Sequence, residues 1–251
     1  MKTLNRNLTV SPKLLNSITT MKKNRSIIQW MLTAALAVSA GNASAVTKAW
    51  TGASGTTTNW STAGNWSASG APASTDDVVL NDGGNTNAAG TVNNVVDSSF
   101  AGSVKSLSYA NTNGFHTTLI APGKALIMNG SGANFNVGTG SSNSLQSGNL
   151  QVYTTITGSG GSLLITNGIN SLFILQSTVD GLQGTHKAVL DLSGLDYFGG
   201  KPGTIRVGLG NTSTRQGVGQ LIMAKTNTLT LTRGFDPDFI VGDAKTVLEA
   251  R

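Results

Sequence analysis

The sequence has no cysteine and only two histidines, and these scarcities exclude several kinds of chemistry. Without cysteine there are no disulfides, iron–sulfur clusters, thiolate zinc sites or cysteine nucleophiles. His116 and His186 have no carboxylate or histidine partner at ligand spacing, so both are expected in turns or on the surface. The motifs of phosphate loops, dinucleotide-binding loops and serine nucleophile elbows are also missing. The sequence therefore predicts no metal and no cofactor.

Charged residues are scarce as well, at 11% of the chain, against about 25% in ordinary globular domains. Glycine, by contrast, contributes 32 residues, and asparagine, serine and threonine are abundant throughout. These four residue types serve turns and disfavour helix interiors. The composition therefore predicts a protein of strands and turns.

The net charge of +6 comes from the N-terminal segment alone. Residues 1–45 hold six basic residues and no acidic one, which leaves 11 of the 17 basic residues to balance 11 acidic residues. The six are Lys2, Arg6, Lys13, Lys22, Lys23 and Arg25. Because residues 46–251 are formally neutral, they offer no electrostatic footprint for nucleic acid, and no such partner is predicted.

Residues 1–45 have the pattern of a helical, cleavable secretory signal. A basic stretch at residues 22–25 precedes the apolar run Ile27–Ala40, and Ala43 and Ala45 form an A-x-A cleavage site. The apolar run is about 14 residues long, shorter than the roughly 20 that span a bilayer as a helix. We expect cleavage after Ala45, a true start at Met21 rather than Met1, and a protein secreted by, or displayed on, a Gram-negative-type bacterium.

The rest of the chain is a series of short runs in which apolar residues alternate with polar ones, a pattern typical of strands. No stretch shows the periodicity of a long amphipathic helix, so the class is all-β: a sandwich, a barrel or a β-solenoid. Short strands and frequent Gly, Ser and Asn corners favour a right-handed parallel β-helix, although a strict sequence repeat is missing. The expected strands are Thr75–Leu80, Val104–Tyr109, Thr117–Ile120, Ala125–Met128, Ala133–Val137, Leu150–Ile156, Ser162–Thr166, Ser171–Leu175, Ala188–Leu192, Thr204–Leu209, Gln220–Ala224, Thr228–Thr232 and Phe239–Val241.

Two groups of residues are candidates for function. Trp50, Trp60 and Trp66 lie in a polar stretch, where they are expected either to pack across the open end of the β-structure or to form a platform that stacks sugars. Asp191 and Asp196 are the carboxylates to consider for polysaccharide cleavage, which needs two carboxyl groups at about 5 to 9.5 Å. These two carboxylates lack the neighbouring basic and aromatic cluster of an active site, so catalysis is not expected. For the three tryptophans, packing is favoured over sugar stacking.

A resemblance to a known family rests on residues 50–80, with Trp50-Thr51-Gly52 and the two Asn-Trp pairs, and on residues 190–196, 210–216 and 221–230. These stretches resemble bacterial exported proteins with autotransporter-associated β-strand repeats, of the verrucomicrobial, PEP-CTERM-associated type. The resemblance implies a right-handed β-helical surface or secreted protein. The chain departs from this family at its C-terminus, which has no barrel, sorting tripeptide or closing apolar helix.

The expected organisation is a signal peptide at 1–45, a Trp-rich N-terminal cap with the first strands at 46–82, and a β-solenoid at 83–251 that is truncated at its C-terminus. The leading hypothesis is a non-enzymatic, exported solenoid with a structural, adhesive or matrix role, bound to extracellular polysaccharide or other surface proteins. Membrane contact is expected only through the signal peptide or a missing C-terminal anchor. The alternatives are a polysaccharide lyase or hydrolase that uses Asp191 and Asp196, and a carbohydrate-binding module that uses Trp50, Trp60 and Trp66.

Overall fold

The computed structural model describes residues 45–112, 114–138, 151–168, 171–174, 187–208, 218–232 and 239–241. All of them belong to one compact unit, Ala45–Arg251, and residues 1–44, which include most of the predicted signal and Ala43, lie outside the described ranges. Apart from a single 3-10 turn at Ala63–Asn65, the regular elements of these ranges are strands. Among the same residues, no helix has the length and apolarity needed to cross a membrane.

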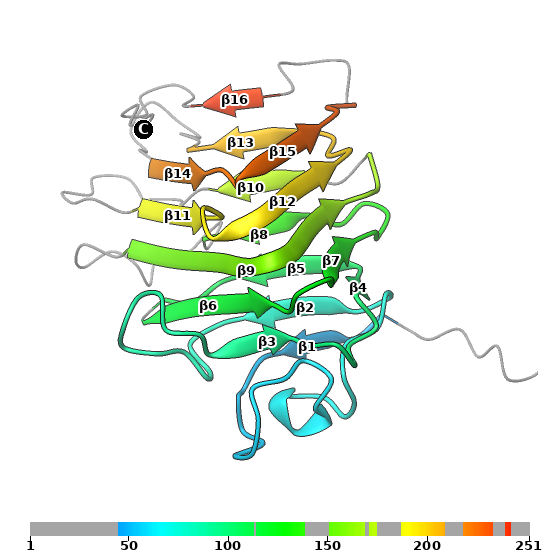
Figure 1. The fold of residues 1–251 in the computed structure, drawn as a ribbon, viewed down its shortest axis with the longest axis vertical. Helices are drawn as coiled ribbons and strands as arrows, with labels where there is room; N and C mark the ends of the chain where they lie inside the picture. The colour runs from blue at the N-terminus through cyan, green and yellow to red at the C-terminus, as the bar shows by residue number, and fades with distance from the viewer. Residues whose placement is uncertain are drawn as a thin grey trace, which may run out of the picture. The chain divides into compact units, whose positions relative to one another are not determined.

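The strands coil into a right-handed β-solenoid of about five turns, which confirms the predicted fold class (Figure 1). Each turn passes through three parallel sheets, called here face 1, face 2 and face 3. Face 1 contains β1 (Thr47–Ala49), β2 (Asp77–Leu80), β5 (Ser106–Tyr109), β8 (Phe135–Val137), β10 (Leu172–Ile174), β13 (Ile205–Val207) and β16 (Phe239–Val241). Face 2 contains β3 (Asn94–Val96), β6 (Phe115–Ile120), the first part of β9 (Gln151–Ile165), β11 (Lys187–Asp191) and β14 (Val218–Ile222). Face 3 contains β4 (Ser103–Val104), β7 (Ala125–Met128), the second part of β9, β12 (Leu195–Gly200) and β15 (Thr226–Leu229).

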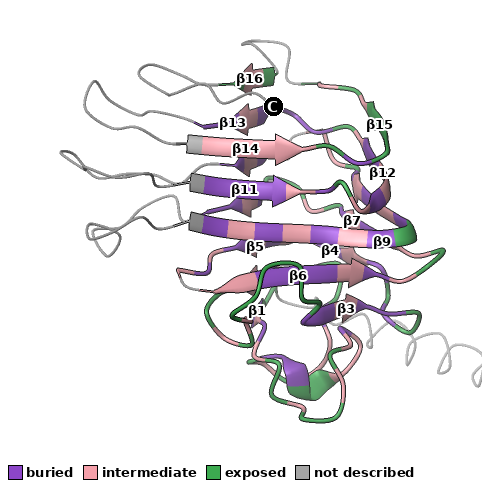
Figure 2. Cartoon of the chain, turned by 60° about the vertical axis from the view of Figure 1, so that its left-hand side comes forward, coloured by how far each residue is buried: buried purple, intermediate pink, exposed green. Residues whose placement is uncertain are grey.

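The core is built from ladders, because each inward side chain lies above the inward side chain of the turn before. One ladder of face 1 contains Val78, Leu107, Phe135, Leu172 and Ile205, all of them buried. Alternate residues of a strand point to opposite sides, so every second position is buried, as the purple and pink bands along β9 show (Figure 2). The period-two runs of the sequence are the source of this arrangement.

The turns stay in register although they differ in length. Val78 pairs with Leu107, 29 residues further along, and Phe135 pairs with Leu172, 37 residues further along. Part of the difference lies in the connections: residues 166–171 separate β9 from β10, whereas Lys105 alone separates β4 from β5. A constant ladder with variable connections explains why the sequence carries no strict repeat.

At one corner of the coil the structure differs from the prediction. The sequence predicts separate strands at Leu150–Ile156 and Ser162–Thr166, with a glycine-rich corner between them, and the structure has the single strand β9. β9 pairs with strands of face 2 along its first part and with strands of face 3 along its second part, so the corner lies within it. Gly158 takes φ +146 at this corner, and a Cβ there would lie 2.1 Å from the carbonyl oxygen of Ile120. Glycine is thus required for the bend, and the pairing with β12 shifts register across it, from Leu195 with Gly158 to Tyr197 with Ser162.

The N-terminal end of the coil is closed by a cluster of aromatic rings. Trp66 packs edge to face on Trp50 and on Trp60, at centroid distances of 5.1 and 5.3 Å, and Trp60 packs in the same way on Phe100. The indole Nε1 of Trp60 donates to Asn94 Oδ1 of β3, and that of Trp66 donates to the Trp60 carbonyl, both at 2.9 Å. These aromatic side chains shield the apolar interior of the first turn from water, since no earlier turn of the described residues stacks on it.

Substitution of Trp60 by alanine tests this closure. We expect the variant to lose about 3 to 5 kcal/mol of unfolding free energy, because a fully buried indole and its hydrogen bond to Asn94 are removed together. Urea denaturation followed by circular dichroism measures the change. As a control, Phe239→Ala at the partly exposed β16 should cost far less, and equal midpoints for wild type and Trp60→Ala would contradict the proposed closure.

Candidate functional site

The two carboxylates considered for catalysis lie close in sequence but serve different local structures. Asp191, at the end of β11, accepts a hydrogen bond from the backbone amide of Ser193 at 2.8 Å and so shapes the turn that follows. Asp196, on β12, accepts from the Gly160 amide and from the Lys225 ammonium, each at 2.6 Å. These partners come from the preceding and the following turn, so Asp196 ties three consecutive turns together.

The bonds to Asp196 also fix its charge. The hydrogen bond from Lys225, followed by that from the Gly160 amide, lowers the pKa of this carboxyl below its ordinary value. The group is therefore ionised at neutral pH and engaged on both oxygens. A general acid for glycoside cleavage needs a raised pKa instead.

The other described carboxylates are engaged in the same way. Burial raises the pKa of Asp97, but hydrogen bonds from Ser61 and Ser99 outweigh it and lower the pKa. Asp77 likewise has a lowered pKa, because bonds from Ser106 and Lys105 exceed the effect of burial. Asp76 and Asp82 accept hydrogen bonds from backbone amides of neighbouring segments. Every aspartate of the described ranges thus has a structural partner.

The three tryptophans considered for sugar binding are buried in the N-terminal cluster. Trp50 and Trp60 are 0% exposed and Trp66 is 5% exposed. Stacking against a sugar requires an accessible ring face, and in this conformation none of the three indoles has one. Their position agrees with the packing interpretation of these residues.

His116 lies in the core, which corrects the expectation of a turn or surface position. It is fully buried on β6 and faces inward between β3 and β9. Its Nδ1 lies 3.1 Å from Asn93 Nδ2, and its Nε2 lies 2.5 Å from the Asn81 carbonyl oxygen. Because an amide nitrogen only donates and a carbonyl only accepts, the ring carries its proton on Nε2.

This histidine belongs to a hydrogen-bonded polar core in the first two turns. Asn93 Oδ1 accepts from the Thr117 amide and from Asn94 Nδ2, so the Asn93 side chain cannot turn over without losing both bonds. Burial lowers the pKa of His116, and this outweighs the opposing effects of the Asn81 carbonyl and Asp82. A second proton on Nδ1 would face the amide hydrogens of Asn93. The network therefore requires neutral His116.

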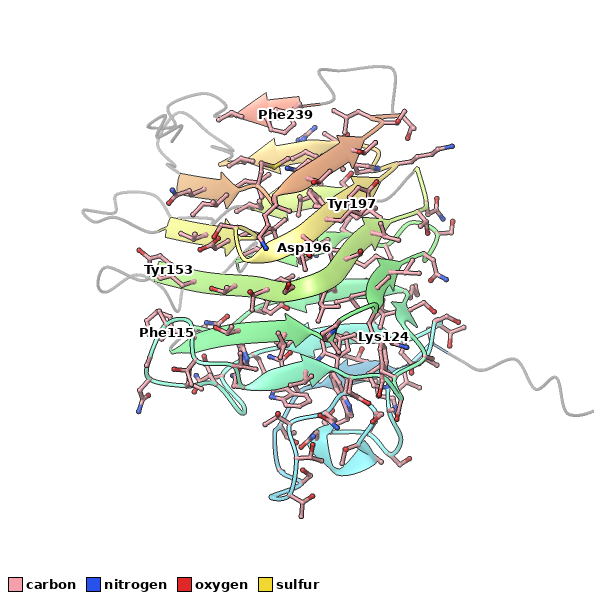
Figure 3. All side chains as sticks on the ribbon, in the orientation of Figure 1. Phe115, Lys124, Tyr153, Asp196, Tyr197 and Phe239 are labelled. Atoms are coloured by element: carbon pink, nitrogen blue, oxygen red, sulfur yellow. The ribbon has the colours of Figure 1, made fainter. Side chains whose placement is uncertain are left out.

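The outer surface of face 3 carries a feature that no sequence motif indicates. Tyr197 of β12 projects outward, because its neighbour Phe198 is fully buried in the core. In the strand register it lies between Ser162 of β9 and Thr226 of β15. Figure 3 shows Tyr197 and Asp196 together on β12. We call Tyr197 with Gly199, Ser162 and Thr226 the Tyr197 surface.

A second outward aromatic group lies on face 2. The rings of Phe115 and Tyr153 are neighbours in the register of β6 and β9, with centroids 6.0 Å apart and a tilt of 39° (Figure 3). Here the two rings pack against each other. This pair therefore provides a comparison for Tyr197, whose ring lies against the backbone of its own strand.

Within the described residues, no group of three histidine, cysteine or acidic side chains lies close enough together to hold a metal ion. No protein-family model, curated protein or solved structure matches this chain. Any function for the groups described above is therefore argued from their geometry alone.

The neutral state of His116 predicts that acid destabilises the fold. The unfolded chain takes up a proton at this residue near pH 6.5, whereas the folded chain does so only at lower pH. Stability is thus complete above about pH 6.5 and falls as the pH drops below it, by up to about 1.4 kcal/mol per pH unit.

Urea denaturation between pH 5 and pH 8 measures this dependence. The variant His116→Gln should lose the slope in this interval, and His186→Gln, which keeps His116, should retain it. An identical slope in His116→Gln and wild type would show that another group is responsible.

Proposed function

We propose that this chain is an exported, non-enzymatic β-solenoid with a structural, adhesive or matrix role at the surface of a Gram-negative-type bacterium. The observation that carries the proposal is the use of the carboxylates. All six described aspartates accept hydrogen bonds: five join separate segments of the chain, and that of Asp191 shapes the turn after β11. A hydrolase or lyase needs carboxylates directed at a substrate, and this arrangement favours a passive role instead.

The repetitive surface of the solenoid supports an adhesive role. Each turn presents a short row of outward side chains, and successive turns place similar rows side by side. On face 3 these include Ser162, Thr226 and Thr228, whose hydroxyl groups suit weak contacts with polymers. Several weak contacts along one polymer combine into firm attachment, because the second contact forms within an existing complex.

Export is supported by the start of the compact unit. The predicted cleavage site follows Ala45, and the compact unit begins at Ala45. The backbone nitrogen of Val46 lies 3.2 Å from Asp76 Oδ1, and Asp76 is only 6% exposed. Cleavage would convert this nitrogen into an ammonium group beside a carboxylate and so strengthen the contact. Removal of the signal would thus leave the first strand, β1, in place and anchor its start more firmly.

Expression of the full chain in a Gram-negative host tests the export proposal. We expect the protein outside the cytoplasm with Val46 as its first residue, as measured by intact mass and N-terminal sequencing. Ala45→Leu should block processing, because the peptidase requires small residues at this position and at Ala43. Ser44→Leu is the matched control and should be processed normally. Retention of residues 21–45 on a cytoplasmic protein would refute the proposal.

The same processed protein tests the absence of catalysis. Incubation with pectin, alginate and fucoidan should release no new reducing ends and no unsaturated sugars. If one of these polymers were depolymerised and Asp191→Asn or Asp196→Asn abolished the reaction, the passive role would be wrong and the enzymatic alternative correct.

A further inference from the structure

Gly199 has no backbone reason to be glycine. Its φ lies outside the left-handed region, whereas the next residue, Gly200, takes φ +122. A Cβ at Gly200 would lie 2.0 Å from the Ile165 carbonyl oxygen, so glycine is required there by the backbone. At Gly199 the three nearest atoms outside its chain neighbours belong instead to the Tyr197 side chain. A Cβ would lie 2.5 Å from Tyr197 Oη and 2.6 Å from its Cε1 and Cζ.

These distances place the hydroxyl end of the Tyr197 ring against Gly199, on the outer surface of β12. Any larger residue at position 199 would displace the ring from the strand. Glycine in a strand costs about 0.5 to 1 kcal/mol and often marks a position that something must approach closely. Here the approaching group is the hydroxyl end of the Tyr197 ring, and Tyr197 remains partly exposed.

The surroundings of the ring are polar but weakly charged. Ser162 and Thr226 flank Tyr197 on the neighbouring turns, and Leu164 and Thr228 flank Gly199. Asp196, next in sequence, forms an ion pair with Lys225 at 2.6 Å, which cancels the charge of both groups. A partly exposed aromatic ring between hydroxyl groups is complementary to a flat, uncharged and hydroxyl-rich molecule.

We propose that the Tyr197 surface binds a neutral β-linked glucan by stacking. In such a chain the ring substituents are equatorial, so each glucose unit has a flat C–H face that fits the exposed side of the Tyr197 ring. The flanking hydroxyls of Ser162 and Thr226 are placed to bond the sugar hydroxyls. This inference specifies the partner in the proposed adhesive role and rests on that role.

A purified full chain and cellohexaose test the inference. Saturation-transfer NMR and a titration give the dissociation constant, which we expect to be on the order of millimolar for one ring. Tyr197→Leu keeps an apolar cover over Gly199 and removes the ring, so it should weaken binding at least about tenfold with little change in the urea midpoint. Tyr197→Phe should keep binding, and Tyr153→Ala, on face 2, is the matched control.

Gly199→Ala tests the geometry without changing the ring. Its added methyl group should lift Tyr197 from the strand and weaken cellohexaose binding as strongly as Tyr197→Leu does. Unchanged binding by Tyr197→Leu, or no binding by wild type, would overturn the inference. Tighter binding of a hexagalacturonate than of cellohexaose would overturn the neutral ligand class. These failures are distinct from a failure of export, which the N-terminus of the processed chain reports separately.

Discussion

The stacking of each turn on its neighbour, in one fixed register, is the interaction on which the rest of this structure depends. A single turn has no second layer to cover its inward side chains, so its interior is buried only by the ladders that it forms with adjacent turns. Val78, Leu107 and Phe135 belong to one such ladder. Within the described part of the chain the first turn has no preceding neighbour, and Trp50, Trp60 and Trp66 cover it instead.

The ladders also explain why the inside and the outside of the coil differ in chemistry. Backbone hydrogen bonding and the core hold the turns together, so outward side chains are free to vary. Asp196 reinforces the stacking through Gly160 and Lys225 of the adjacent turns. Beside it, the absence of a side chain at Gly199 leaves room for the hydroxyl end of the Tyr197 ring. We interpret the first contact as support for the coil and the second as preparation of a binding surface.

The sequence predicts much of this fold because a strand with one buried side has a clear period of two. Ala125–Met128 and Phe239–Val241 appear as β7 and β16 with the expected bounds. β12 is missed, because an aspartate and two glycines interrupt its apolar pattern, and the Tyr197 surface is missed with it. The burial of His116 is missed for a different reason: its partners Asn81 and Asn93 are brought to it only by the coiling of the chain.

Engineered disulfides test the register most directly, because the native chain has no cysteine. Ser108 and Asn136 are paired on adjacent turns of face 1, while Val79 lies one turn further from Asn136. Adjacent strands are about 4.8 Å apart, within the range of a disulfide, and strands two turns apart are not. Ser108→Cys with Asn136→Cys should cross-link on oxidation, and Val79→Cys with Asn136→Cys should not. Cross-linking of the second pair, or of neither, would contradict the stacked solenoid.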